Sequence, residues 1–217
     1  HVMGLKTDSI EIDTVYCNLV QEETKFVYKA GVRCDDQILC PGFSAVLDGY
    51  IGPQDADAHL VYANKKRVKG VDLGVKAYFS DSLTTLNLYP SEPIIAFSKF
   101  GLNEDNFVSI DTLGRVFANV DLHSKEDSCR ISVNADPAGE CSQDIRAMVR
   151  NLDLGGLLTV MPFLPKMDGL INLDANYIQG GENILVSGEI EAEDFKYEGA
   201  LVGDLKAMVD YSPAGEN

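Results

Sequence analysis

The densest group of side chains that could do chemistry is a run of acids near the end of the sequence. Glu189, Glu191 and Glu193 occupy alternate positions and are followed directly by Asp194. On a β-strand, alternate residues point to one side, so three carboxylates would lie together. Such a group could bind Ca²⁺ or supply the acid and base of a glycosidase. Glycosidase carboxylates face one another across a sugar-binding cleft, which aromatic residues normally line, and this chain has no tryptophan. We therefore interpret the acids as the solvated side of a strand.

The remaining candidates for catalysis or metal binding are isolated. Asp55 and Asp57 resemble half of a calcium loop, but the rest of the EF-hand pattern is missing. His59 and His123 each stand alone in strand-like surroundings, outside any H-E-x-x-H motif. Nucleophile-elbow, P-loop and dinucleotide-binding motifs are also missing. The sequence therefore predicts a protein that is not an enzyme, with no catalytic residue, no metal site and no cofactor.

The five cysteines allow two short disulfides but do not require them. Cys34 and Cys40 are close in sequence, as are Cys129 and Cys141, so each pair could close a hairpin in an oxidising compartment. Because no C-x-x-C motif occurs, zinc and thioredoxin-like sites lack support. The disulfide state stays open, and we favour small buried apolar side chains.

Charge excludes several classes of partner. The chain of 217 residues has a formal net charge of −16 at pH 7. This field repels nucleic acid, and it also argues against docking onto an anionic membrane through a basic patch. The one basic cluster comprises Lys65, Lys66, Arg67 and Lys69, which we interpret as a solvated loop between strands.

No segment is long enough to be a membrane anchor. The apolar run from Leu154 to Leu164 falls well short of the roughly 20 residues that a spanning helix needs. The first four residues resemble the remnant of an expression tag, which leaves 5–217 as a single β domain. We expect this domain to be an internal piece of a longer protein.

Apolar and polar residues alternate over most of the chain. Val116, Ala118, Val120 and Leu122 show this period of two, and at least six other segments repeat it. Strands with one apolar and one wet side produce this pattern, so the sequence predicts an all-β protein of about a dozen strands. Three turn signals separate strands: Asp48-Gly49, Gly180-Gly181 and Pro137-Ala138-Gly139.

Only one region indicates helix. Around Ile145 and Val149 the spacing fits both a helix and a strand, and a short helical turn is expected within 155–164, ended by Pro165. Similar strand–loop–strand units begin at Gly114 and Gly169, which favours an elongated antiparallel meander over a closed barrel. The apolar side of such a sheet must be covered, either in a filled sandwich or by an apolar cargo.

The second half of the chain resembles a known family. The resemblance rests on "YPSEPIIAF", "FGLNEDNFVSI", "LGRVFANVDL", "NLDLGGLLTVMPFLPKMDGLINLDANY" and "VSGEIEAEDFKYEGALVGDLKAMVDYSP", which cover most of Leu88 to Pro213. These segments are similar to the AsmA-like superfamily of Gram-negative envelope proteins. The closest resemblance is to the DUF490-type periplasmic region of the translocation and assembly module subunit TamB, in its Bacteroidetes form. From Leu5 to Leu86 the chain matches only in strand character, and its cysteines do not follow the family pattern.

The resemblance implies a fold, a place and a role. Members of this family are anchored in the inner membrane, span the periplasm and form a long, strongly curved sheet with an apolar concave groove, called a β-taco. They act in outer-membrane biogenesis, both in assembling β-barrel proteins and in moving phospholipids between the membranes. By resemblance, the partners would be lipid acyl chains or nascent outer-membrane strands, together with an outer-membrane barrel protein of the assembly machinery.

Two sets of residues follow from this hypothesis. The groove would be lined by apolar strand residues, and a short turn would plug or narrow it. The groove candidates are Val116, Val120, Ile171, Leu173, Ile184, Val186, Ile190, Leu205 and Val209. The plug candidates are Leu157, Leu158, Met161, Phe163 and Leu164. Three alternatives remain: strand addition at an open edge, a filled β-sandwich that serves as a scaffold or adhesion module, and an enzyme acting on envelope polysaccharide.

Overall fold

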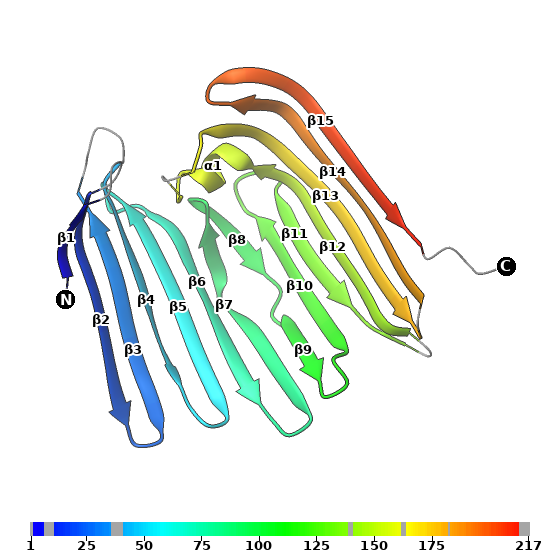
Figure 1. Ribbon diagram of the computed structural model, residues 1–217, viewed down its shortest axis with the longest axis horizontal. Helices are drawn as coiled ribbons and strands as arrows, with labels where there is room; N and C mark the ends of the chain where they lie inside the picture. The colour runs from blue at the N-terminus through cyan, green and yellow to red at the C-terminus, as the bar shows by residue number, and fades with distance from the viewer. Residues whose placement is uncertain are drawn as a thin grey trace.

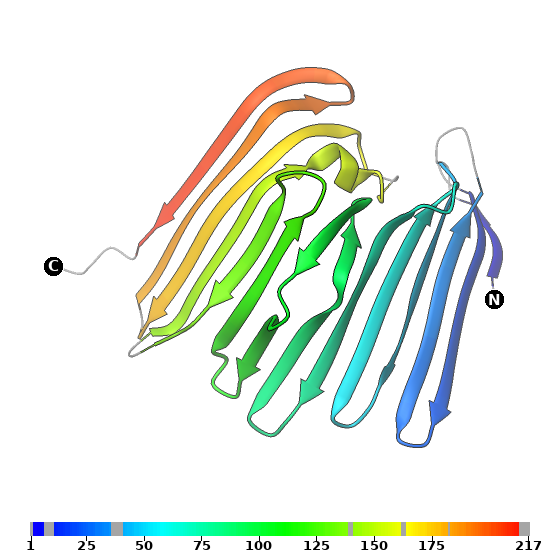
Figure 2. The ribbon, with the colours of Figure 1, turned by 180° about the vertical axis from the view of Figure 1, so that it is seen from behind.

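The computed structural model is a single antiparallel sheet with one short helix, which confirms the all-β fold class (Figure 1). It describes residues 2–6, 11–35, 41–138, 141–161, 164–181 and 183–212. Fifteen strands join in this sheet within the described part of the chain. Figures 1 and 2 show these strands side by side in one layer.

The elements have the following bounds. The first eight strands are β1 (Val2–Lys6), β2 (Glu11–Glu22), β3 (Lys25–Cys34), β4 (Phe43–Ile51), β5 (Asp55–Asn64), β6 (Lys69–Phe79), β7 (Leu83–Ile95) and β8 (Ser98–Leu102). The next four are β9 (Phe107–Asp111), β10 (Val116–Ser124), β11 (Arg130–Ala135) and β12 (Cys141–Asp153). The chain then forms α1 (Leu154–Leu158), β13 (Met167–Gly180), β14 (Asn183–Tyr197) and β15 (Ala200–Tyr211).

Neighbours in sequence are neighbours in the sheet, with one local exception. The strands follow chain order, except that β9 pairs with β7 and β10 and so shares with β8 the position between them. Between β8 and β9, the buried Asn106 accepts a hydrogen bond from Leu88 N (2.7 Å) and donates one to Leu88 O (3.3 Å). The Asn106 amide thus bridges the gap in the backbone ladder. The predicted meander is therefore confirmed.

Two local predictions are settled by the strand bounds. The turn predicted at Asp48-Gly49 is wrong, because both residues lie inside β4 and pair with β3 and β5. The ambiguous segment around Ile145 is strand β12, and the helix starts only at Leu154. Residues 2–4, which the sequence interpretation sets aside, belong to β1 and pair with β2. β12 is a strand because it pairs with β11 on one side and β13 on the other. Periodicity alone could not distinguish a strand from a helix in this segment.

A row of irregularities crosses the C-terminal strands at one level. The register shifts after Val149 in β12, at Gly169 in β13 and at Asp194 in β14. Asn151 (φ 50°) and Asp194 (φ 51°) take left-handed backbone conformations there. Bulges bend the strand that carries them and increase its twist. Figure 1 shows β13, β14 and β15 bending at this end, close to α1.

The tightest packing lies at the centre of the sheet. Phe100, Leu102, Val120, Leu122 and Cys129 form a buried cluster, against which partly buried residues of β7, β9, β11 and β12 pack. Burial, with the nearby carboxylates of Asp127 and Asp153, raises the pKa of the Cys129 thiol to about 11. This cysteine is a free thiol in the structure, which agrees with a small apolar side chain. Cys40 and the side chain of Cys141 lie outside the part of the chain that the structure describes.

Candidate functional site

Strand pairing brings many of the apolar residues from β2 to β15 to one side of the sheet. Residues paired across an antiparallel ladder point to the same side. From Val120 the pairing runs through Val133, Ala147, Ala175 and Gly188 to Val209. We call this side the apolar face and the opposite side the polar face. In the N-terminal half, the apolar face continues through Ala30, Leu47, Leu60 and Leu73, which pair in turn from β3 to β6.

The registers bring all nine groove candidates to the apolar face. Val116 and Val120 lie on β10, and the other seven lie on β13, β14 and β15. Their exposure rises toward the last strand: 6% at Val120, 44% at Ile190 and 59% at Val209. The candidates are therefore brought together on one surface, and no second layer of described strands covers it (Figures 1 and 2). Their part in binding an acyl chain stays a prediction.

None of the nine groove candidates lies in the N-terminal half of the apolar face, and the alternation in β4 was overlooked. Leu47 and Ile51 of β4 and Leu60 of β5 lie on this face and are 41%, 56% and 39% exposed. The signal was present, because Phe43, Ala45, Leu47 and Ile51 alternate. The apparent Asp48-Gly49 turn concealed it. A trough of about 310 Å³ lies here, lined by Val15, Tyr16, Cys17, Ala30, Gly31, Val32, Ala45, Leu47 and Leu60.

Helix α1 reaches from the end of β12 to a distant strand. The Tyr62 hydroxyl of β5 donates a hydrogen bond to the carbonyl of Thr159, directly after the helix (3.2 Å). Gly155 and Gly156 follow Leu154 in α1, where neighbouring side chains leave little room for a Cβ. A Cβ on Gly155 would overlap the Asp168 carboxylate, and one on Gly156 would lie 2.7 Å from Asp153 Oδ2. Among the plug candidates, Leu157, Leu158 and Met161 are half-buried and Leu164 is 40% exposed. Phe163 lies outside the described residues.

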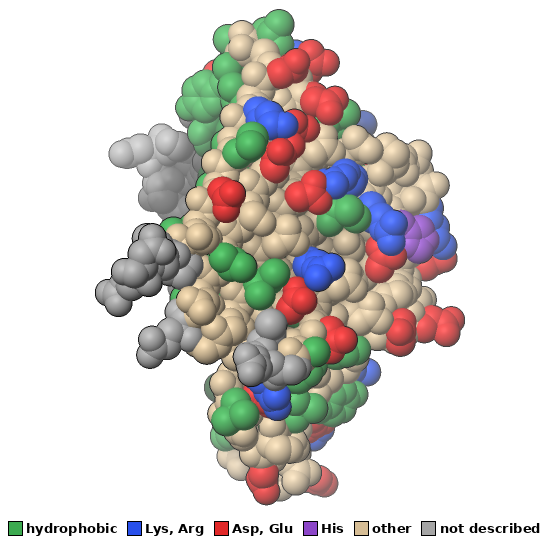
Figure 3. Space-filling model, turned by 90° about the vertical axis from the view of Figure 1, so that its right-hand side faces the viewer, with side chains coloured by type: hydrophobic (Ala, Val, Ile, Leu, Met, Phe, Trp, Pro, Cys, Tyr) green, Lys and Arg blue, Asp and Glu red, His purple; other side chains and the backbone are tan. Residues whose placement is uncertain are grey.

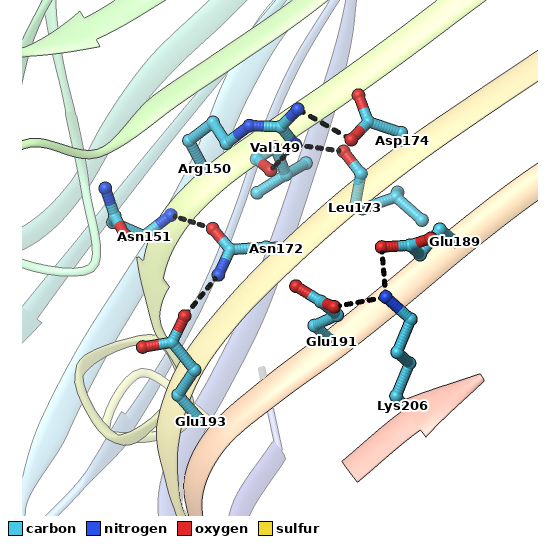
Figure 4. Close-up of polar contacts among 10 residues, drawn as sticks. All are labelled: Val149, Arg150, Asn151, Asn172, Leu173, Asp174, Glu189, Glu191, Glu193 and Lys206. Carbon is cyan, nitrogen blue, oxygen red and sulfur yellow. Dashed lines mark hydrogen bonds and ion pairs between the residues drawn. The ribbon is translucent and has the colours of Figure 1, made fainter. Parts of the chain in front are cut away.

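The run of acids belongs to the polar face. Glu189 and Glu191 of β14 both accept hydrogen bonds from Lys206 Nζ of β15, at 2.7 Å and 2.6 Å (Figure 4). Hydrogen bonds from Lys206 and its charge hold the pKa of Glu191 below its ordinary range. Asn172 donates to Glu193 at 3.2 Å. Among the described residues these carboxylates are paired with a lysine or an amide and are not grouped as a metal site. Figure 3 shows the same mixing of acidic and basic side chains over the surface seen from the β15 side.

A second polar cluster contains the isolated histidine and aspartate candidates. His59 Nε2 lies 2.7 Å from Asp72 Oδ1, and the Tyr89 hydroxyl donates to Asp57 Oδ1 at 2.7 Å. Burial alone would raise the pKa of Asp72, but hydrogen bonds from Lys69 and His59 outweigh it and lower this pKa. Asp55 is tied to Lys25 and Tyr50. His123 lies on β10 and packs over Gly101. In each case the polar group supports neighbouring strands.

The comparisons with known proteins give no relative. No protein-family model, no curated protein and no solved structure matches this chain. Within the described ranges, no group of His, Cys, Asp and Glu side chains is arranged to hold a metal ion. The same ranges contain no helix with the length and apolar character needed to cross a membrane.

Proposed function

We propose that this chain is a non-enzymatic carrier whose apolar face shields lipid acyl chains from water. The observation that carries the proposal is the apolar face itself, which runs from β2 to β15 with large side chains partly exposed. Soluble monomers rarely expose continuous apolar surface of this extent without a partner. Each methylene of an acyl chain buried there would contribute about 0.8 kcal/mol.

The accessible surface supports an uncovered single layer. The chain exposes 13684 Å². A compact monomer of 23.7 kDa is expected to expose about 9,800 Å², roughly 3,800 Å² less. A filled sandwich buries its inner sides and would lie near the compact value, so this alternative is not supported.

The contact between β5 and α1 supports a groove rather than a flat sheet. Tyr62 on β5 and the end of β12 lie six strand steps apart, or about 29 Å along the sheet at about 4.8 Å per step. Helix α1 advances only about 7.5 Å over its five residues. The bond from Tyr62 to Thr159 therefore supports a sheet that bends toward its apolar face between these strands. An apolar concave groove, narrowed at one end by α1, is the form we propose.

The envelope setting rests on the family resemblance. We place the chain in the periplasm, as part of an inner-membrane-anchored protein of a Gram-negative cell. There the groove would carry phospholipids between the inner and outer membranes or support outer-membrane protein assembly. Non-directional apolar contact suits this role, because an acyl chain can slide between equivalent positions.

A pair of substitutions on one strand tests the proposal. Ile190 and Leu185 both lie on β14 and are 44% and 47% exposed, but Ile190 is on the apolar face and Leu185 on the polar face. With the fluorescent acyl probe cis-parinaric acid, Ile190→Lys should reduce the number of molecules bound per chain. Leu185→Lys should not. Native mass spectrometry of the purified chain should also show bound lipid. Failure of the wild-type chain to bind any acyl probe or lipid would overturn the proposal.

Strand addition at an open edge is the second candidate. β15 has a described partner on one side only, and its twelve residues are almost all exposed. Such an edge can add an extended segment of another chain, such as a nascent outer-membrane strand. Protection of β15 amides from hydrogen exchange by an unfolded outer-membrane protein tests this alternative.

A further inference from the structure

The strongest unassigned feature is a basic cavity at one end of β3, β4 and β5. It has a volume of about 510 Å³ and lies where these strands meet the β5–β6 turn. Among its described lining residues three are cations and one is an acid, in a chain whose net charge is −16. These described residues are Arg33, Cys34, Asp35, Gly42, Phe43, Ser44, Asn64, Lys65 and Arg67.

The β5–β6 turn is held in a fixed shape. Asn64 Oδ1 accepts hydrogen bonds from the backbone N–H groups of Lys66 (2.9 Å) and Val68 (3.1 Å). Arg67 N–H donates to Asn64 O at 2.8 Å, and Arg67 itself has φ 61°. The turn therefore presents Lys65 and Arg67 to the cavity, and both side chains are exposed. Arg33 also contacts Asp35 at 3.1 Å, so its charge is partly balanced.

The cavity and the apolar trough lie on the same strands. Cys34 and Phe43 line the cavity, and Val32 and Ala45, two residues further along β3 and β4, line the trough. All four lie on the apolar face, because Cys34 pairs with Phe43 and Val32 with Ala45. Two residues of a strand span about 7 Å, so the lining residues of the two hollows lie about 7 Å apart along each strand. Small side chains such as Ala30 and Ala45 form the trough floor, while Leu47 and Leu60 stand beside it.

We propose that these hollows form one binding site for an anionic amphiphile. The phosphate or carboxylate of its headgroup would lie against Arg67 and Lys65 of the β5–β6 turn, and its acyl chain would lie in the trough along β3 and β4. Arginine is well suited to such oxyanions because its guanidinium can donate two parallel hydrogen bonds. This inference rests on the proposed function, and it adds the headgroup class and the place where the headgroup is held.

Calorimetric titration of the full chain with three probes tests the site. The probes are n-dodecyl phosphate, the uncharged n-dodecyl maltoside and inorganic phosphate, with both amphiphiles below micelle-forming concentration. We expect dodecyl phosphate to bind at least about tenfold more tightly than dodecyl maltoside, because a charge-assisted hydrogen bond is typically worth that factor or more. Inorganic phosphate should bind much more weakly than dodecyl phosphate, since it lacks the chain.

Two charge reversals on the exposed surface complete the test. Arg67→Glu should weaken dodecyl phosphate binding by at least about tenfold and leave dodecyl maltoside binding within about twofold. Lys29→Glu makes the same charge change on β3, on the polar face away from the cavity, and should leave both affinities within about twofold. Melting curves check that both variants remain folded.

The outcomes separate this inference from the proposed function. Equal affinities for the two amphiphiles, or equal effects of Arg67→Glu and Lys29→Glu, would overturn the headgroup site while leaving the acyl carrier intact. Phosphate binding as tight as that of dodecyl phosphate would overturn the joined site, because it would assign the cavity to a free anion. If neither amphiphile bound, both the site and the proposed function would fail.

Discussion

At the residue scale, cross-strand pairs of a glycine and an aromatic residue recur in this sheet. Gly31 pairs with Tyr16, Gly74 with Tyr89, and in each pair the aromatic ring lies over the glycine. Gly101 and His123 repeat the arrangement. A ring that covers a glycine shields backbone which would otherwise face water, and such pairs help fix strand register.

Substituting Gly74 tests this packing. A Cβ at position 74 would overlap the ring of Tyr89, whose hydroxyl is held by Asp57. Gly74→Ala should therefore lower the free energy of unfolding by about 1–3 kcal/mol, the usual cost of overpacking. Gly188→Ala is the matched control, because its added Cβ would meet only Asp174 O, at an ordinary 3.5 Å. Urea denaturation measures both. Equal effects of the two variants would show that the Tyr89 ring moves aside at no cost.

The chemistry of single residues was only partly predictable from sequence. Alternation was enough to predict that Glu189, Glu191 and Glu193 share one side of a strand. It could not predict their partners, since Lys206 lies on the next strand and Asn172 on the previous one. The same limit applies to the basic turn. From the sequence, Lys65 and Arg67 were interpreted as part of a solvated loop and not as part of a binding site. The cavity forms where the ends of β3 and β4 lie beside that turn, and this arrangement could not be predicted from the sequence.

At the element scale, α1 is held by contacts that no local pattern encodes. The sequence predicts a short helical turn between Gly155 and Pro165, and α1 occupies Leu154–Leu158. Its far contact, Tyr62, is 97 residues away. The Tyr62 ring also stacks on Phe43, with centroids 5.7 Å apart, and meets Phe97 edge-on. The aromatic cluster of Phe43, Tyr62 and Phe97 therefore contacts the end of the helix through the Tyr62 hydroxyl.

Removing one hydroxyl tests how firmly α1 is held. Tyr62→Phe keeps the ring and deletes the hydroxyl that donates to Thr159 O. We expect a loss of about 0.5–1.5 kcal/mol in unfolding free energy. We also expect faster hydrogen exchange at the amides of Thr159, Val160 and Met161, because the helix end loses its anchor. Tyr78→Phe, at an exposed site on β6, should change neither quantity. Unchanged exchange in Tyr62→Phe would mean that α1 is held by its contacts with β12 and β13 alone.

The elements also differ in how well they can be predicted from the sequence. The strand with the clearest alternation, β10, was predicted with its apolar residues correctly grouped. The bulges in β12 and β14 were not predictable, because Asn151 and Asp194 adopt positive φ without the glycine that usually signals it. These positions bend strands only in the context of the paired sheet.

At the scale of the whole molecule, the uncovered apolar face distinguishes this chain from a compact globule. A compact protein of 217 residues has a radius of gyration of about 17 Å. A single layer of fifteen strands exposing 13684 Å² is more extended than that. Hydrophobic burial in the free chain is correspondingly incomplete, and an apolar ligand that binds only the folded state should stabilise it.

Small-angle scattering of the lipid-free monomer tests this shape. We expect a radius of gyration clearly above about 17 Å, with light scattering used to confirm that the particles are monomeric. Addition of dodecyl phosphate at about 100 times its dissociation constant should raise the free energy of unfolding by about 2.7 kcal/mol. It should leave the radius of gyration nearly unchanged, because a pre-formed groove fills without refolding. A lipid-free monomer near 17 Å would mean that the sheet closes on its own apolar face, which would remove the physical basis for a carrier.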